Sequence, residues 1–216
     1  MGRIAWTPRP GFEDLASVAV SAHRDLARSK GARFFTALAP CVVGSPANPS
    51  ASLLVQYAAR AEDWWFASAF ERLDGRTAVW VAKRFAAAII EAAAMGWVHG
   101  DIHPGTVVIC PAEHGLRLDG WWSAVRLGER LTVKPAAPTP PRWLGGAGAS
   151  EQLSVAQAAA YLRTVTAPKR LIEVFDEHAT NPGSAGQFFS DVREVAHRVY
   201  GKAVWHELAE PAETPI

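Results

Sequence analysis

Cysteine is scarce in this chain, and its scarcity excludes one class of protein. Only Cys41 and Cys110 occur among the 216 residues, each beside apolar neighbours, and they do not form a Cys-x-x-Cys pair. Small secreted domains that depend on disulfides carry more cysteines at closer spacing. We therefore expect two buried thiols and a reducing compartment.

Net charge and long apolar runs are also lacking. The 22 lysines and arginines almost balance the 21 aspartates and glutamates, and a formal charge of +1 does not indicate a nucleic-acid partner. The most apolar stretch, Val79 to Val98, is interrupted by Lys83, Arg84 and Glu91, so it does not have the pattern of a membrane span. The first residues lack the apolar run of a signal peptide. The sequence predicts a soluble, cytoplasmic protein that binds neither nucleic acid nor membrane.

The chain does contain the composition of a globular protein, with strands predicted early. Hydrophobic residues make up 49% of the chain and charged residues 20%, which is enough apolar surface for a core. The patterns predict a short buried strand at Ser17–Val20 and a helix at His23–Leu38. They also predict a hairpin formed by the runs Ser52–Ala58 and Trp64–Phe70.

A long helix and a second hairpin are predicted near the middle of the chain. The spacing of apolar residues predicts a helix at Thr77–Met95, and Gly96 stands where a helix stop is expected. The apolar run Val107–Cys110 predicts a buried strand, and Leu116–Leu118 predicts the strand that returns beside it.

The remainder is predicted to be mainly helical. Residues 132–149 are rich in Pro, Gly and Ala and are predicted to form a long loop. Helices are predicted at residues 151–164, 168–178 and 185–199. This order predicts an α+β protein with a reduced α/β lobe at residues 1–72, a mainly helical lobe at 73–216 and a cleft between them.

The stretch from His99 to Thr106, His-Gly-Asp-Ile-His-Pro-Gly-Thr, concentrates the chemistry-bearing residues. On a strand, His99, Asp101 and His103 would face one way, and imidazole with carboxylate suits zinc or iron. Pro104 follows directly, and the stretch lies between a helix and a strand, which is not the setting of a ligand-bearing strand. A metal-dependent hydrolase remains one interpretation of these residues.

The same stretch resembles the catalytic loop of the protein-kinase-like superfamily. The pattern H-G-D-x-H-P-G-N is typical of aminoglycoside and other small-molecule phosphotransferases and of some bacterial Ser/Thr kinases. In that fold the loop follows a long helix and precedes a strand hairpin, and both are predicted here. The resemblance implies a bilobal fold and, for an active member, Mg-ATP as the cofactor.

The resemblance assigns roles to residues of the loop. Asp101 fills the position of the catalytic base, and Thr106 replaces the asparagine that holds Mg²⁺. His99 corresponds to a histidine that supports the backbone of the loop. His103 lies beside Asp101, where a substrate could bind.

Other nucleotide-binding positions depart from the family pattern. Asp119-Gly120 resembles a shortened metal-binding D-F-G segment, and the alternation of Leu116 and Leu118 favours the register in which Gly120 takes the place of the metal aspartate. The resemblance places Ser21 where the phosphate-binding lysine should stand, and no Gly-x-Gly-x-x-Gly precedes it.

These departures favour a pseudokinase: a kinase-like protein with degraded nucleotide and metal positions that acts as a binding or regulatory module for an unknown protein partner. The alternative is a divergent phosphotransferase acting on Ser/Thr or a small hydroxylated molecule, with Asp119 and Thr106 holding the metal. The metal-dependent hydrolase built on the two histidines and Asp101 is the third interpretation.

Overall fold

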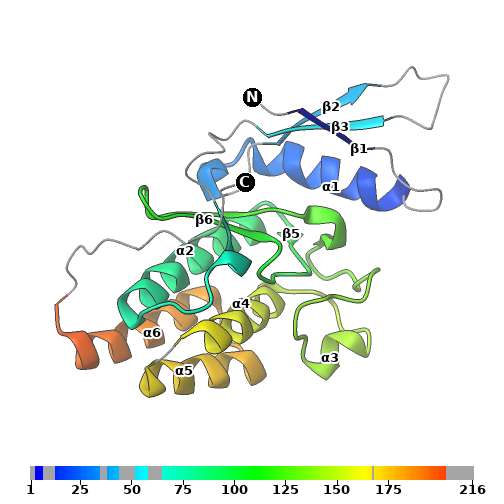
Figure 1. Cartoon of the computed structure of the whole chain (residues 1–216). Coiled ribbons are helices and arrows are strands. Elements are labelled where there is room, and N and C mark those ends of the chain that lie inside the picture. The colour runs from blue at the N-terminus through cyan, green and yellow to red at the C-terminus, as the bar shows by residue number, and fades with distance from the viewer. Residues whose placement is uncertain are drawn as a thin grey trace.

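The computed structural model gives a mixed α+β fold (Figure 1). It describes residues 3–6, 13–34, 38–43, 52–57, 65–166 and 168–202. The α+β class predicted from the sequence is therefore confirmed, whereas the kinase-like arrangement and the division at residue 72 stay predictions. Within the described residues, no helix combines the length and apolarity that crossing a bilayer requires.

A three-stranded antiparallel sheet forms near the N-terminus. Its strands are β1 (Arg3–Trp6), β2 (Leu38–Val43) and β3 (Ser52–Tyr57), in the order β1-β3-β2. Helix α1 (Glu13–Leu26) lies between this sheet and the rest of the molecule (Figure 1). The sheet and α1 together form the upper part of the view in Figure 1.

The predicted strand at Ser17–Val20 is wrong, because these residues belong to α1. Ala19, Ala22 and Leu26 are buried, and their spacing of three and four residues is the signature of one helical face. The predicted helix at His23–Leu38 is also wrong beyond its first turn. The chain leaves α1 after Leu26, forms one 3₁₀ turn, η1 (Ala32–Phe34), and has entered β2 at Leu38.

The first predicted hairpin is also wrong, although one of its strands is present. Strand β3 matches the predicted run, but its partners are β1 and β2. The second run forms only a short strand, β4 (Trp65–Phe66), followed by a 3₁₀ turn, η3 (Ala67–Ala69). Strand β4 pairs with a later strand, β6 (Val107–Cys110), so the two runs belong to different sheets. The predicted turn between them lies outside the described residues.

The long central helix is confirmed as α2 (Gly75–Ala94). Its N-terminus is capped by Asp74, whose carboxylate accepts the N–H of Arg76 at 2.8 Å and of Thr77 at 3.2 Å. The helix ends before Gly96, whose φ of +77° is a conformation that glycine adopts without strain.

The second hairpin is confirmed as well. Strand β6 (Val107–Cys110) is fully buried and pairs with β7 (Gly115–Leu118), so that Val107 faces Leu118. The sheet order is β4-β6-β7. Two short strands, β5 (Trp97–Val98) and β8 (Val125–Arg126), pair just before and after this region. The stretch from His99 to Thr106 therefore connects β5 to β6.

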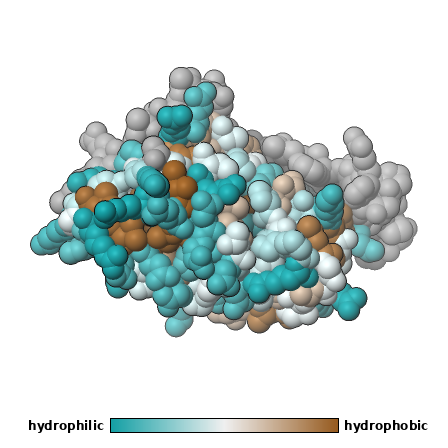
Figure 2. Space-filling model, turned by 90° about the horizontal axis from the view of Figure 1, so that it is seen from below, coloured by the Kyte–Doolittle hydropathy of each residue, from teal (hydrophilic) through white to brown (hydrophobic). Residues whose placement is uncertain are grey.

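The C-terminal part is helical, as predicted. A short helix, α3 (Pro141–Leu144), interrupts the predicted loop, and the long helices follow as α4 (Glu151–Val165), α5 (Lys169–Thr180) and α6 (Ala185–Tyr200). Helix α4 is buried along most of its length, and one hydrophobic core joins it to α1 and α2. The face built by α5 and α6 is largely hydrophilic, with apolar side chains gathered in small groups (Figure 2). Cys110 is buried as predicted, whereas the side chain of Cys41 lies outside the described part.

Candidate functional site

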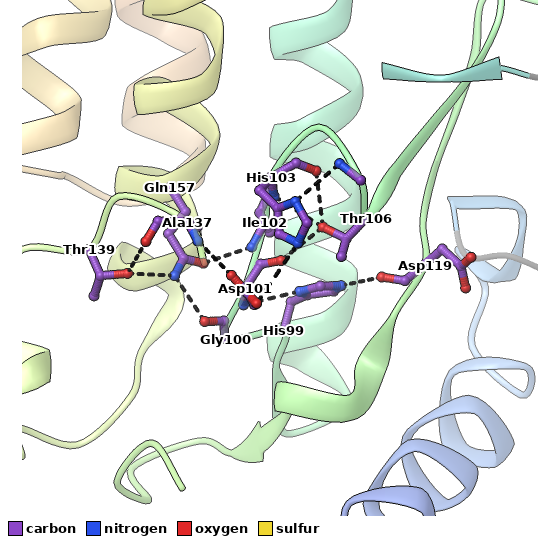
Figure 3. A network of polar contacts seen from close by, with 11 residues as sticks. His99, Gly100, Asp101, Ile102, His103, Thr106, Asp119, Ala137, Thr139 and Gln157 are labelled. Carbon is purple, nitrogen blue, oxygen red and sulfur yellow. Dashed lines mark hydrogen bonds and ion pairs between the residues drawn. The ribbon is translucent and has the colours of Figure 1, made fainter. Parts of the chain in front are cut away.

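The loop from His99 to Thr106 is held by a network of polar contacts (Figure 3). It emerges from β5 and enters β6. Its partners come from Asp119, directly after β7, from the long loop before α3, and from α4. The residues that the sequence singled out in this stretch are therefore brought together, along with others that it did not indicate.

His99 is buried and uses both ring nitrogens. Its Nε2 donates to the backbone oxygen of Asp119 at 2.6 Å, and its Nδ1 accepts the backbone N–H of Asp101 at 3.2 Å. These partners require the neutral ring with the proton on Nε2. Burial lowers the pKa of His99 to about 4, so the ring stays neutral near pH 7. Trp121 packs edge-on against it at a centroid distance of 4.7 Å. These contacts support the structural role that the resemblance assigned to His99.

Asp101 places one carboxylate oxygen against the backbone of another segment. Its Oδ1 accepts the N–H of Ala137 at 2.7 Å. Its Oδ2 lies 3.9 Å from Nε2 of His103, and the aspartate side chain is 13% exposed. One oxygen is thus engaged within the protein, and the other faces a partly open position beside a histidine.

His103 faces the same position, and its ring is also tied to the loop. Its Nδ1 accepts the backbone N–H of Gly105 at 3.1 Å. Its side chain is 28% exposed, about twice as much as that of Asp101. The predicted proximity of His103 to Asp101 is present in this geometry, and only Nε2 of the ring is directed toward the carboxylate.

Thr106 uses its hydroxyl to close the loop. The hydroxyl donates to the backbone oxygen of Asp101 at 2.8 Å and accepts the N–H of His103 at 3.0 Å. It also lies 3.1 Å from the backbone oxygen of His103. Thr106 is buried, so this oxygen is surrounded by its own loop. A threonine engaged in this way is poorly placed to bind Mg²⁺, which prefers unhindered oxygen ligands in octahedral geometry.

The methyl group of Thr106 lies in the space that a side chain at position 120 would need. Gly120 has a φ of +69°, and a Cβ atom added to it would lie 2.8 Å from Cγ2 of Thr106. A side chain at position 120 would therefore be directed at the position where the resemblance expects the metal asparagine. The favoured register, in which Gly120 takes the place of the metal aspartate, requires position 120 to face position 106 in this way.

Asp119 is buried and contributes its backbone to the site. Its N–H donates to the oxygen of Thr106 at 2.9 Å, and its own oxygen accepts from His99. Figure 3 shows the Asp119 carboxylate turned to the side away from Asp101. The two aspartates therefore do not converge on a common point in this structure.

Gln157, on α4, was not indicated by the sequence. Its Oε1 accepts the N–H of Ile102 at 3.0 Å, and its Nε2 donates to the oxygen of Gly100 at 2.9 Å. The same Nε2 lies 3.0 Å from Oγ1 of Thr139, in the long loop. Gln157 is completely buried and joins the candidate catalytic loop to the segment that contacts Asp101. Its two partners in the candidate catalytic loop are 55 and 57 residues away along the chain, so no local pattern predicts these contacts.

Ser21 lies within α1 and not at the end of a strand. The strand that would have placed it at the lysine position does not exist, so this assignment is corrected. Helix α1 does approach the site, because it packs on η4 (Trp121–Ser123), the turn directly after Gly120.

Two side chains of α1, Asp25 and His23, connect the helix to residues around the site. The Asp25 carboxylate accepts from Nε1 of Trp97 and from the guanidinium of Arg126, both at 3.0 Å, and these hydrogen bonds lower the pKa of Asp25. His23 is buried beside Trp121, and burial lowers its pKa to about 3. Helix α1 thus contacts the surroundings of the site through the exposed ion pair of Asp25 with Arg126 and through the buried, neutral imidazole of His23.

The arrangement gives little support to the H-x-D-x-H metal site. His99 has no ring nitrogen available for a metal, because both are hydrogen-bonded. Within the part of the chain that the structure describes, no group of three His, Cys, Asp or Glu side chains has the geometry of a metal site. The hydrolase interpretation therefore has no support from the loop geometry.

Comparison with known proteins adds no relative. No protein-family model matches the chain, and no curated protein matches it. The resemblance to the protein-kinase-like superfamily thus rests on the residues of the loop and on the elements around them.

Proposed function

We propose that this protein is a kinase-like binding module whose nucleotide and metal positions have been converted to structural use. The observation that carries the proposal is the close approach of the Thr106 side chain to the backbone of Gly120. These are the two positions at which the resemblance expects Mg²⁺ ligands. The hydroxyl of Thr106 is hydrogen-bonded within its own loop, and Gly120 has no side chain.

The arrangement of elements supports the kinase-like part of the proposal. A long helix, a polar loop and an antiparallel hairpin follow one another in the order that the resemblance requires. In kinases a small-lobe helix carries the glutamate that pairs with the phosphate-binding lysine. Helix α1 is the element in a comparable place, because it packs on the turn after Asp119-Gly120. Its Asp25 pairs with Arg126 instead.

The surroundings of Asp101 support the loss of catalysis. A catalytic base must be within hydrogen-bond reach of the hydroxyl whose proton it accepts. Here the N–H of Ala137 occupies one carboxylate oxygen at 2.7 Å. Charge neutralisation by bound metal contributes several kcal/mol to phosphoryl transfer, and each loss of about 1.4 kcal/mol is a tenfold loss in rate. A site with neither metal ligand is therefore expected to be a poor phosphotransferase.

The experiment is a thermal unfolding measurement with Mg-ATP and with ATP plus EDTA. A ligand at a hundredfold excess over its Kd stabilises a protein by about 2.7 kcal/mol, which is an easily detected shift. We expect no Mg²⁺-dependent shift. A clear shift with Mg-ATP that EDTA removes would contradict the proposal.

One observation favours the second candidate, a divergent phosphotransferase. The side chain of Asp101 is 13% exposed and its Oδ2 lies 3.9 Å from Nε2 of His103, a position that a substrate hydroxyl could share. This candidate predicts transfer of phosphate from Mg-ATP to a Ser/Thr peptide mixture or to a polyhydroxylated small molecule. Transfer that Asp101→Asn abolishes would establish it in place of the binding module.

A further inference from the structure

The segment from Arg126 to Ala149 carries an excess of positive charge; we call it the basic segment. It contains Arg126, Arg130, Lys134 and Arg142 but only one acidic residue, Glu129. The chain as a whole has a formal charge of +1, so this local excess is balanced elsewhere. Charge gathered on one segment of a nearly neutral protein is a local property that a binding partner can recognise.

Backbone contacts hold the basic segment beside the candidate site. The N–H of Gly128 donates to the oxygen of Ala149 at 2.8 Å, and the N–H of Ala149 donates to the oxygen of Glu129 at 2.6 Å. These bonds close the base of the segment. Between them, Ala137 donates to Asp101, so the middle of the segment is tied to the loop of Figure 3.

Three of the four cations are available to a partner. Arg130 and Lys134 are exposed, and neither takes part in an ion pair within the described residues. Arg142 is exposed and stacks over the ring of Trp143, with its guanidinium carbon 3.8 Å from the ring centroid. Arg126 is different, because it pairs with Asp25.

The nearby acidic side chains are already engaged. Glu129 accepts the backbone N–H of Arg126 at 3.1 Å, and Asp101 accepts that of Ala137. Glu151, just after the segment, accepts the backbone N–H of Ala185. Each of these carboxylates thus has one oxygen hydrogen-bonded to the backbone of the protein, whereas Arg130, Lys134 and Arg142 are exposed.

Exposed leucines accompany the cations. Leu127 is 51% exposed and Leu144 is 52% exposed, and they are among the few large hydrophobic side chains on the described surface. The guanidinium of Arg130 lies against Gly146, about 3.6 Å from where a Cβ atom would be, so it is close to the end of α3 that carries Leu144. Cations interspersed with exposed leucines suit a ligand with both acidic and apolar groups.

We propose that the basic segment binds an acidic linear segment of a protein partner, with an apolar side chain of the partner contacting Leu127 or Leu144. The proposal names the partner chemistry for the binding module and therefore rests on the proposed function. A protein is favoured over a nucleic acid, because nucleic-acid affinity depends on many phosphate contacts and the segment offers three free cations in the described structure. The leucines would contribute nothing to phosphate contacts.

The test uses two fluorescein-labelled peptides and the full chain. One peptide alternates Glu and Asp with two leucines, and the other has Gln and Asn in place of the acids. Binding is measured by fluorescence anisotropy at about 50 mM and about 500 mM salt, because screening weakens contacts between exposed charges. We expect the acidic peptide alone to bind at low salt, and its Kd to rise at high salt.

Charge reversal identifies the surface. Arg130→Glu with Lys134→Glu is expected to weaken acidic-peptide binding by about tenfold or more. The matched control, Lys169→Glu with Arg193→Glu, changes the net charge equally on the exposed surfaces of α5 and α6. It is expected to change the Kd by less than about twofold. Leu127→Ser with Leu144→Ser tests the apolar contribution without changing charge and is expected to weaken binding.

Several results would overturn the proposal. They are equal binding of both peptides, no binding up to about 1 mM, or equal weakening by the control variant. Tighter binding of a single-stranded oligonucleotide or of phosphatidylserine vesicles than of the acidic peptide would also overturn it. A thermal shift with Mg-ATP together with selective binding of the acidic peptide would refute only the proposal that the nucleotide site is inactive. No thermal shift together with no binding of the acidic peptide would refute only the proposed role of the basic segment.

Discussion

The carboxylate of Asp101 accepts a hydrogen bond from the backbone N–H of Ala137, across 36 residues of sequence. This contact joins the candidate catalytic loop to the basic segment and gives the aspartate a structural use. It also predicts different effects for two substitutions at Asp101, because Asp101→Asn keeps an oxygen that can accept the N–H of Ala137 and Asp101→Ala does not.

Asp101→Ala should destabilise the fold by about 1–3 kcal/mol, since the partly buried N–H of Ala137 loses its partner. Asp101→Asn keeps an oxygen in the same place and should cost less. The free energy of unfolding, measured by urea denaturation, checks both values. Equal stability of the parent and Asp101→Ala would show that the contact contributes nothing to the fold.

Gln157→Leu should be more damaging, because it removes the partners of the N–H of Ile102 and of the oxygen of Gly100 at a fully buried position. Each buried group left unpaired costs about 1–3 kcal/mol. Gln152→Leu, on the same helix but partly exposed, is the matched control and should change stability by less than about 0.5 kcal/mol. Similar losses in both variants would argue against a special role for Gln157.

Two of the buried histidines, His99 and His23, should make the fold sensitive to acid. In the native state their pKa values are lowered, to about 4 for His99 and about 3 for His23, whereas an unfolded histidine has a pKa near 6.5. The unfolded state therefore binds more protons below pH 6.5, and stability falls as the pH falls toward the native values.

Lowering the pH from 7 to 5 should cost about 2 kcal/mol for each of these histidines. Urea denaturation at both pH values measures the difference. His23→Leu should reduce the pH dependence, and His197→Leu, at an exposed position on α6, should leave it unchanged. A pH dependence that His23→Leu does not reduce would contradict the assignment to buried, neutral rings.

The sequence predicted the helix and the strand on either side of the candidate loop, because several local signals agree in those segments. Helix α2 has the apolar period, the Asp74 cap and the Gly96 stop, and β6 is an uninterrupted apolar run. Helix α1 was misassigned because Ser17–Val20 is short and contains valines, which favour strands in isolation. Burial of Ala19, Ala22 and Leu26 on one face outweighs that preference in the folded protein.

The contacts that close the site could not be read from the sequence. Ala137 acts through its backbone N–H, which every residue except proline possesses, so its residue type carries no signal. Gln157 acts across a large sequence separation from a helix whose buried face also contains small apolar residues. The alternation of Leu116 and Leu118 in β7 favoured Gly120 as the position of the metal aspartate, and a side chain at position 120 would indeed lie against Thr106. The correspondence of Gly120 to that aspartate stays a prediction.

The central claim is that positions 106 and 120 have lost the metal ligands, and restoring oxygens there tests it. The double variant Thr106→Asn with Gly120→Asp places an amide and a carboxylate at the two facing positions. Aspartate is among the residues that tolerate the φ of +69° found at Gly120. Asp119→Asn is the matched control, because it removes the one carboxylate that the alternative would use as a metal ligand.

Calorimetric titration of Mg²⁺ with a non-hydrolysable ATP analogue into the parent and these variants decides the matter most directly. The account predicts no binding by the parent or by Asp119→Asn, and Mg²⁺-dependent binding by the double variant, whose two new oxygens can share one cation. Binding by the parent that Asp119→Asn abolishes would contradict it, since Asp119 would then be a working metal ligand in an intact nucleotide site.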